Sequence, residues 1–155
     1  MEIEKYLTFE VADGMYALPI CAVREIISDA ADITPMPGAP ECAKGILHIR
    51  GDVVPVVDLR CRFGAPAGNT DCVIVTDCDM EEAEYLGLAA DRVCSVEDFD
   101  PQQIKIPPRF LRGASFISGV YKLGERLVLI ISPERLVTDS LRSALNTDDR
   151  TEDNG

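Results

Sequence analysis

The residue types that perform catalysis are sparse in this chain of 155 residues. Nucleophilic catalysis needs a nucleophile held beside a base, and the only histidine available as that base is His48. His48 lies in "GILHIRG", an alternating apolar stretch that indicates a strand, and this favours a structural or surface role. No glycine-rich phosphate-binding motif opens a helix. We therefore predict that the protein is not an enzyme and has no catalytic residues.

The cysteines are too dispersed in the sequence to predict a metal site. They are Cys21, Cys42, Cys61, Cys72, Cys78 and Cys94. Structural zinc sites use cysteine and histidine ligands at short spacings, and no C-x-x-C pair is present, so we expect no metal and no cofactor. Without an export signal, the even number does not indicate a disulfide framework, and several cysteines are expected to be small core residues. Cys21 and Cys61 are the two expected to be partly exposed.

One cation has an unusual place in the sequence. Arg50 stands with Gly51 and Asp52 at the tip between two apolar runs, residues 45–49 and 53–59. An active-site cation, a structural turn residue and a docking contact all fit this position. The elements around the tip must decide between them.

The charge of the chain limits its partners. The formal net charge is −12, so phosphate backbones and anionic membrane surfaces are repelled, and we expect no nucleic acid and no direct membrane insertion. No apolar run approaches the roughly 18 residues of a membrane span, and the N-terminal residues "MEIEKYLTFE" lack a signal-peptide pattern. These features favour a cytoplasmic protein.

Short strands dominate the predicted structure. Asp13-Gly14 is a hairpin signal between residues 6–12 and 15–20, and about ten short strands at close spacing favour a sandwich or barrel. Ile20, Val23 and Ile26 fit either a helical turn or a short irregular strand. Single turns are expected after Asp58 and Asp100. A clearer helix follows Ser132, with one apolar stripe of Leu136, Val137, Leu141, Ala144 and Leu145.

The two halves of the chain resemble each other. A shift of 74 residues places Gly45 on Gly119 and matches the apolar residues of 45–58 with those of 119–132. A shift of 70 residues matches 17–26 with 87–96. The fold class that we predict is mainly β, with two five-stranded barrel subdomains, a few short helices and a C-terminal helix. We expect one domain over residues 1–145, with intertwined subdomains of approximately 15–65 and the rest, and an acidic flexible tail over 146–155.

The stretch "KGILHIRGDVVPVVDLRCRFG", residues 44–64, resembles the signature of the bacterial chemotaxis coupling protein (CheW) family. The resemblance extends over residues 5–138. It implies two SH3-like barrels and a non-enzymatic adaptor. Such an adaptor couples the cytoplasmic tips of chemoreceptors (methyl-accepting chemotaxis proteins) to the histidine kinase CheA, whose regulatory domain shares the fold. The implied location is the cytoplasm, at membrane-associated receptor arrays.

The resemblance also implies two binding surfaces. The receptor-binding positions are Val23, Glu25, Gly45, Arg50, Gly51 and Val53. The kinase-binding positions are Cys72, Val93, Val96, Gly119, Val120 and Leu123. Arg50 either docks the receptor or braces an internal carboxylate such as Glu25 or Asp58, and one residue can do both. For Val96 and Leu123, ordinary core packing is the favoured interpretation.

Two alternative functions stay open on the sequence alone. One is a CheW-like scaffold for a different kinase pathway, such as pilus-based motility. The other is a small-ligand-binding β-barrel, which would require a polar pocket around His48.

Overall fold

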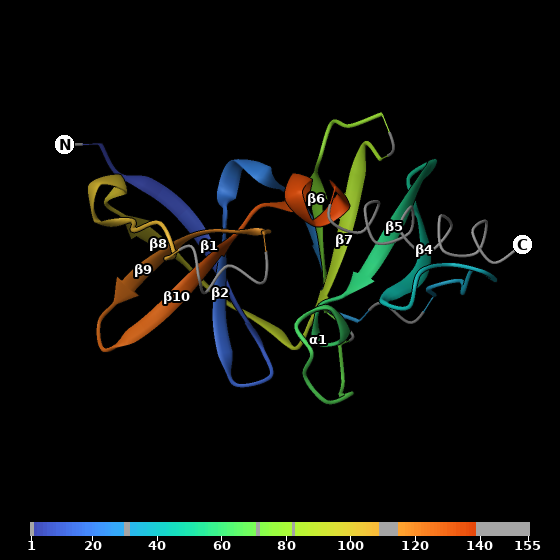
Figure 1. Cartoon of the computed structure of the whole chain (residues 1–155). Helices are drawn as coiled ribbons and strands as arrows, with labels where there is room; N and C mark the ends of the chain where they lie inside the picture. Colours follow the sequence, from blue (N-terminus) through green and yellow to red (C-terminus); the bar gives the residue numbers. More distant parts are fainter. Residues whose placement is uncertain (1, 30–31, 71, 82, 109–114, 139–155) are drawn as a thin grey trace, which may run out of the picture.

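The computed structural model describes residues 2–29, 32–70, 72–81, 83–108 and 115–138. Within these residues, ten strands form two five-stranded sheets that lie side by side (Figure 1). The predicted fold class, mainly β with two five-stranded units, is confirmed.

One sheet, here called the terminal sheet, contains the first two strands and the last three. Its spatial order is β8 (Arg92–Phe99), β1 (Glu4–Val11), β2 (Gly14–Pro19), β10 (Arg126–Ile131) and β9 (Ile117–Leu123). The expected hairpin at Asp13-Gly14 joins β1 to β2, with Val11 opposite Gly14. All neighbours in this sheet are antiparallel except β2 and β10, which are parallel.

The other sheet, here called the middle sheet, is built from the intervening segment. Its order is β3 (Val23–Ile27), β6 (Cys72–Asp77), β7 (Tyr85–Ala90), β5 (Asp52–Asp58) and β4 (Ala43–Ile49). Here β5 and β7 are the parallel pair. The expected subdomain limits of about 15–65 therefore need correction. The strand β2 pairs with β10 in the terminal sheet, whereas β6 and β7 complete the middle sheet, because pairing between distant strands decides membership.

The two sheets have the same topology, which agrees with the internal repeat. In each, a hairpin at the edge (β4–β5 or β9–β10) joins a second hairpin (β6–β7 or β1–β2) through a parallel pair, and a single strand closes the order. However, β1 and β2 occupy the place in the terminal sheet that β6 and β7 occupy in the middle sheet. The repeats have thus exchanged their hairpins, and each sheet contains strands from both halves of the chain.

One apolar cluster spans both sheets. It includes Phe9 and Leu18 from the terminal sheet, and Ile74 and Leu88 from the middle sheet, all with no solvent exposure. Leu136 also belongs to this cluster. Burial of each such side chain contributes roughly 1.5–3 kcal/mol, so this shared core joins the two sheets into one packed body.

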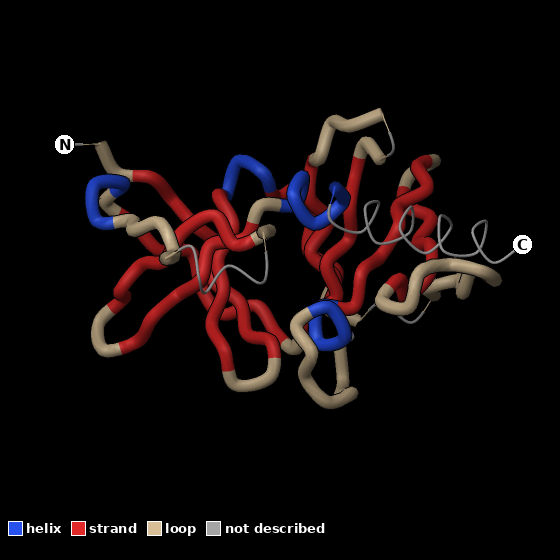
Figure 2. The backbone as a smooth tube through the Cα atoms, in the orientation of Figure 1, coloured by secondary structure: helices blue, strands red, loops and turns tan. Residues whose placement is uncertain are grey.

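Within the described residues, the helical segments are short, as expected (Figure 2). The alternatives for residues 20–27 both occur, because η1 (Ile20–Ala22) leads directly into β3. The turn α1 (Leu59–Arg62) begins where the Asp58 carboxylate accepts a hydrogen bond from the Arg60 N–H at 3.0 Å. A second turn, η2 (Pro101–Gln103), follows Asp100.

The predicted C-terminal helix is seen in its first part. Residues 133–138 are helical and bury Leu136 and Val137 in the core that both sheets share. Leu141, Ala144, Leu145 and the predicted tail over 146–155 lie outside the described residues. Among the described residues, no helix is long and apolar enough to cross a membrane.

The cysteines require one correction. Cys72 and Cys78 are buried, as small core residues should be, whereas Cys21 and Cys94 are exposed. Cys42 and Cys61 form a disulfide, whereas no disulfide was expected from the sequence. They are 19 residues apart in the chain, and the fold places their Cα atoms 5.4 Å apart.

Candidate functional site

The tip of the β4–β5 hairpin explains the position of Arg50. Ile49 pairs with Asp52, so the loop between them has two residues, Arg50 and Gly51. Their φ angles are +49° and +88°, and positive φ at both central residues is what a type I′ turn requires. Gly51 adopts its positive φ without steric cost, because it has no Cβ. The turn directs the Arg50 side chain outward, and 81% of that side chain is exposed.

Arg50 contacts one of the two carboxylates considered from the sequence. Its Nη2 donates a hydrogen bond to Glu25 Oε1 at 3.0 Å, from the tip of the hairpin to β3. Asp58 caps α1 instead. An ion pair with so exposed a cation contributes about 0–1 kcal/mol, so the fold depends little on it. The structure thus contains the expected ion pair between Arg50 and Glu25. The other N–H donors of the Arg50 guanidinium are still free to face solvent.

A groove of about 740 Å³ lies on the outer face of the same hairpin. Its apolar lining includes Met36, Gly45, Val53 and Pro55, and Val53 is 63% exposed. The loop between β6 and β7 supplies acidic residues along it, Asp79, Glu81 and Glu84. This groove can accept an apolar segment of a partner, with a preference for cations along one wall.

The six expected receptor-binding residues do not converge on one pocket. Gly45 and Val53 line the large groove, whereas Glu25 and Arg50 line a small cavity of about 30 Å³ with Val54. Successive residues of a strand point to opposite faces, so Val53 and Val54 separate these two sites. The remaining two differ again: Val23 packs against the shared core and Gly51 is exposed in the turn.

Gly45 has a structural reason to be glycine. Its φ is +144°, and a Cβ there would collide with the carbonyl group of Thr34. Thr34 and Ile46 exchange two backbone hydrogen bonds of 2.8 Å, so the segment around Thr34 covers the edge of β4 through this pair. The glycine therefore lets the covering segment approach, whatever else the groove binds.

Gly119 is the equivalent residue in the terminal sheet. Lys105 and Val120 exchange the same pair of backbone hydrogen bonds beside β9, at 2.9 and 2.8 Å. A Cβ on Gly119 would lie 2.7 Å from Cγ2 of Ile104. The repeat thus gives both edges the same cover, which protects them from unwanted strand pairing.

The expected kinase-binding residues are divided between core and surface. Cys72 and Gly119 are buried, and Val93 packs against the core that both sheets share. Leu123 packs against the smaller core of the terminal sheet, as the core interpretation predicted. For Val96 that interpretation is wrong, because this side chain on the edge strand β8 is 49% exposed. Val120 is half-buried beside its pair with Lys105.

His48 is an exposed residue of β4, which agrees with the surface role expected for it. It lines a shallow groove of about 280 Å³ together with Ile46, Leu47 and Val53, and with Asp32 and Thr34. The described part of the chain contains no group of three or more His, Cys, Asp or Glu side chains placed to hold a metal ion.

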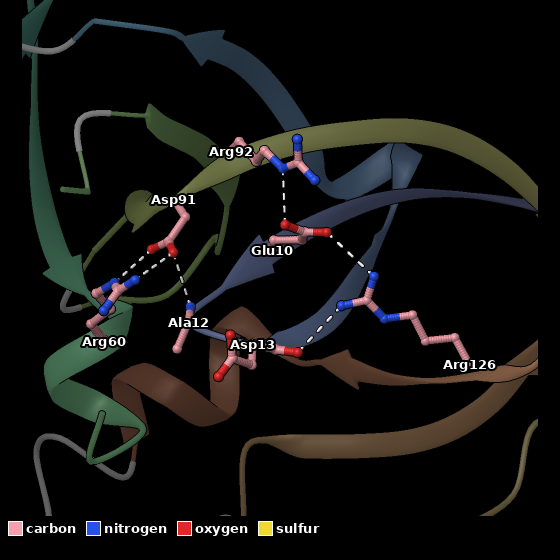
Figure 3. A network of polar contacts seen from close by, with 7 residues as sticks. All are labelled: Glu10, Ala12, Asp13, Arg60, Asp91, Arg92 and Arg126. Atoms are coloured by element: carbon pink, nitrogen blue, oxygen red, sulfur yellow. Dashed lines mark hydrogen bonds and ion pairs between the residues drawn. The ribbon is translucent and has the colours of Figure 1, made fainter. Parts of the chain in front are cut away.

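A polar network that no sequence pattern predicts joins the two sheets (Figure 3). Arg60, on α1 beside the middle sheet, donates from Nε and Nη2 to Asp91 at 2.8 and 2.7 Å. Asp91, at the passage from β7 to β8, also accepts from the Ala12 N–H at 3.0 Å. The hydrogen bonds from Arg60 are the main reason why the pKa of Asp91 lies below its ordinary value.

The same view shows a second carboxylate that ties strands of the terminal sheet together (Figure 3). Glu10 accepts from Arg92 Nε at 2.9 Å and from Arg126 Nη1 at 3.3 Å, which links β1 to β8 and β10. The bond from Arg92 is the main cause of the lowered pKa of Glu10. The spacing of residues 10, 92 and 126 in the sequence does not predict these contacts.

Comparison with known proteins identifies the family. Residues 5–141 match the CheW-like domain. The chain belongs to the CheW-like family. The identification from residues 44–64 is confirmed, and the CheW fold accounts for the two sheets as two SH3-like subdomains.

Individual CheW proteins agree with this assignment. "Chemotaxis protein CheW" of Treponema pallidum is 26% identical, over 84% of this chain and 79% of that protein. The protein of the same name from Klebsiella aerogenes is 27% identical, over 87% and 82%. The crystal structure of the scaffolding protein TtCheW from Thermoanaerobacter tengcongensis has a TM-score of 0.76 and 30% identity, and covers 84% of this chain and 90% of that one.

Proposed function

We propose that this CheW-like chain is a non-enzymatic chemotaxis adaptor. In this proposal it binds the cytoplasmic tip of a chemoreceptor and the regulatory domain of the histidine kinase CheA, and holds them in a fixed geometry. It works in the cytoplasm and is recruited to membrane-associated receptor arrays. The names of its relatives, chemotaxis protein and scaffolding protein, support this role.

One observation carries the proposal: Arg50 and Val53 are exposed at the tip and on the outer face of the signature hairpin. The buried residues of that hairpin, such as Val54 and Val56, account for its packing. An 81% exposed arginine and a 63% exposed valine, three positions apart in the chain, add little to the fold. Side chains of this kind are suited to contacts with a partner.

The groove beside Val53 supplies a place for the receptor. A receptor tip made of helices can lay an apolar face into a groove of this kind, the mode used by many helix-binding proteins. Arg50 can then exchange its exposed contact with Glu25 for a carboxylate of the receptor. Because the exchange replaces one exposed ion pair by another, it costs little free energy.

The kinase surface in this proposal is the edge strand β8. Val96 is the exposed apolar residue among the six expected positions, and β8 pairs with β1 on one side. A regulatory domain with a similar barrel can pack its own edge against such a strand. Val93 and Cys72 then support β8 from inside rather than contact the kinase.

Both surfaces belong to one packed body. The core that both sheets share and the Arg60–Asp91 pair hold the receptor surface on the middle sheet at a fixed orientation to the kinase surface on the terminal sheet. Each contact of modest area is expected to have a Kd on the order of micromolar, and assembly into an array then adds strength through multivalency.

The test is co-sedimentation of the kinase with receptor fragments, with and without this chain. The adaptor function predicts that the kinase enters the receptor pellet only when the chain is present. Equal kinase in the pellet without the chain contradicts the proposal. Capture of a kinase from a pilus-motility pathway in place of CheA supports instead the related scaffold role.

A further inference from the structure

The Cys42–Cys61 disulfide joins two segments that the backbone already holds together. Cys42 directly precedes β4, and Cys61 lies in α1. The Asp58 N–H donates to the Cys42 carbonyl oxygen at 2.8 Å, where β4 and β5 begin to pair. A Cα separation of 5.4 Å lies within the range that a disulfide needs. After the bond opens, this backbone contact therefore keeps the two cysteines close enough for the bond to form again.

The rest of α1 remains anchored without the disulfide. Leu59 is fully buried in the core that both sheets share, and Arg60 holds Asp91 through two hydrogen bonds. Phe63, which follows α1, packs between Tyr16 and Phe116, with ring centroids 4.6 and 5.4 Å away. A chain of this length has enough core to fold without a covalent staple. Opening the bond is therefore a local event.

Small reagents can reach the Cys42–Cys61 disulfide. The other described cysteines are free thiols, and they are either buried or exposed. Cys42 and Cys61 are both partly exposed. Cys72 and Cys78 are buried, and burial raises the pKa of the Cys78 thiol to about 11, which leaves it protonated and unreactive. Cys21 and Cys94 are exposed free thiols, and burial also raises the pKa of Cys94.

The disulfide fastens one wall of the large groove. Met36, Ala39 and Pro40 line that groove and lie just before Cys42. Two backbone hydrogen bonds shape this wall, from Ala39 N–H to Met36 and from Ala43 N–H to Pro40, at 3.2 and 2.9 Å. Its near end is held by the pairing of Thr34 with Ile46, and its far end by the disulfide to α1.

We propose that Cys42 and Cys61 form a thiol–disulfide exchange site whose redox state sets the mobility of the groove wall at residues 35–42. The reductant is a protein or small-molecule dithiol. One of its thiolates attacks a sulfur of the pair and forms a mixed disulfide, and its second thiol then displaces the protein cysteine. Two electrons and two protons pass to Cys42 and Cys61, and the dithiol becomes a disulfide. The oxidised dithiol closes the bond by the reverse steps.

Reduced and oxidised dithiothreitol provide the test on the full chain. Alkylation followed by mass spectrometry should show Cys42 and Cys61 becoming labelled together as the buffer becomes reducing, whereas Cys94 is labelled throughout. Hydrogen exchange at the amides of residues 34–46 should become faster by about tenfold in the reduced chain. The change should reverse when oxidised dithiothreitol is restored.

Matched variants separate this site from the other cysteines. Exchange in C42S/C61S should be fast and independent of the buffer, whereas C21S should respond as the wild type does. Labelling of Cys42 and Cys61 in the oxidised buffer to the same extent as Cys94 would overturn the proposal. Equal exchange of residues 34–46 in both buffers would also overturn it. Neither measurement involves a receptor or kinase, so failure here leaves the adaptor proposal standing.

Discussion

Arg60 and Asp91 form a two-point ion pair across the junction of the two sheets, with N–O distances of 2.8 and 2.7 Å. Both side chains are about one-fifth exposed. Asp91 also accepts the Ala12 N–H from the β1–β2 turn. This single carboxylate therefore connects α1, the β7–β8 passage and the first hairpin, and it is the polar contact on which we expect the relative orientation of the sheets to depend.

Replacing Asp91 by alanine removes these three hydrogen bonds. We expect D91A to lower the free energy of unfolding by about 2 kcal/mol, because the Arg60 guanidinium and the Ala12 N–H lose their partner while half-buried. Urea denaturation measures the change. The matched control is D98A, which breaks an exposed pair with Lys5 and should cost about 0–1 kcal/mol. Equal losses in both variants would show that the Arg60–Asp91 pair has no special role.

The lowered pKa of Asp91 predicts a dependence of stability on pH. The folded state holds Asp91 ionised, so the unfolded chain, with an ordinary aspartate pKa of about 3.9, binds the proton more tightly. The stabilisation is fully present above that value and is lost as the pH falls through the folded-state pKa. Urea midpoints between about pH 6 and about pH 3 should fall less steeply in D91N than in the wild type. Parallel curves for the two proteins would contradict the assignment.

A comparison of Gly45 with Gly51 distinguishes two costs of replacing a glycine: a steric clash of the new Cβ, and an unfavourable backbone conformation. Both have positive φ, but a Cβ on Gly45 meets the Thr34 carbonyl, whereas nothing lies within 4 Å of a Cβ on Gly51. We expect G45A to cost about 3 kcal/mol or more and G51A about 1 kcal/mol, measured by urea denaturation. Similar costs would mean that the covering segment at Thr34 yields easily. Loss of receptor binding in G45A would then reflect a direct contact.

Arg50 is expected to matter for receptor binding and little for stability. R50E reverses the charge opposite Glu25 and should weaken receptor binding by about tenfold or more, with kinase binding retained. Co-sedimentation with receptor fragments measures the first and a kinase pull-down the second. K5E, which reverses another exposed, paired cation, is the control and should leave receptor binding unchanged. Wild-type receptor binding by R50E would leave Arg50 with only its role in the turn and its brace to Glu25.

Val53 can be compared with Leu127, because the two apolar side chains are almost equally exposed. V53D places a charge in the groove and should reduce receptor binding by about tenfold or more, because the carboxylate must lose its water when the partner docks. L127D is the matched control, since Leu127 is 62% exposed but lies on β10 of the terminal sheet. If both variants bind receptor equally, the groove at Val53 is not the receptor surface.

Val96 tests the kinase surface without disturbing the core. V96D should weaken binding to the kinase regulatory domain by about tenfold or more while the urea midpoint stays near that of the wild type. I106D is a control at another exposed apolar residue, which is 76% exposed and lies outside the proposed surface. Wild-type kinase affinity in V96D would remove β8 from the proposal. V93D is less informative, because Val93 packs against the core.

Much of the fold was predictable from local pattern. Alternating apolar residues and turn signals identified the strands, and Asp13-Gly14 and Arg50-Gly51 marked two hairpins correctly because such turns depend on a few adjacent residues. The repeat predicted two similar five-stranded units. The exchange of hairpins between the repeats was not predictable, because each hairpin has an apolar face that fits either sheet. The parallel pairs of β2 with β10 and β5 with β7 decide which sheet it joins.

The features of the candidate site also fall into two groups, those that the sequence predicts and those that only the tertiary structure shows. Residues 44–64 by themselves determined the family and the type of turn that displays Arg50, since both depend on residue order. Only the tertiary structure decided that Val53 and Glu25 serve different pockets, that Val96 is exposed and Cys72 buried, and that Arg60 holds Asp91. It also brought Cys42 to Cys61. These contacts join residues distant in sequence, and their distances follow from how two sheets pack around one core, which no local pattern encodes.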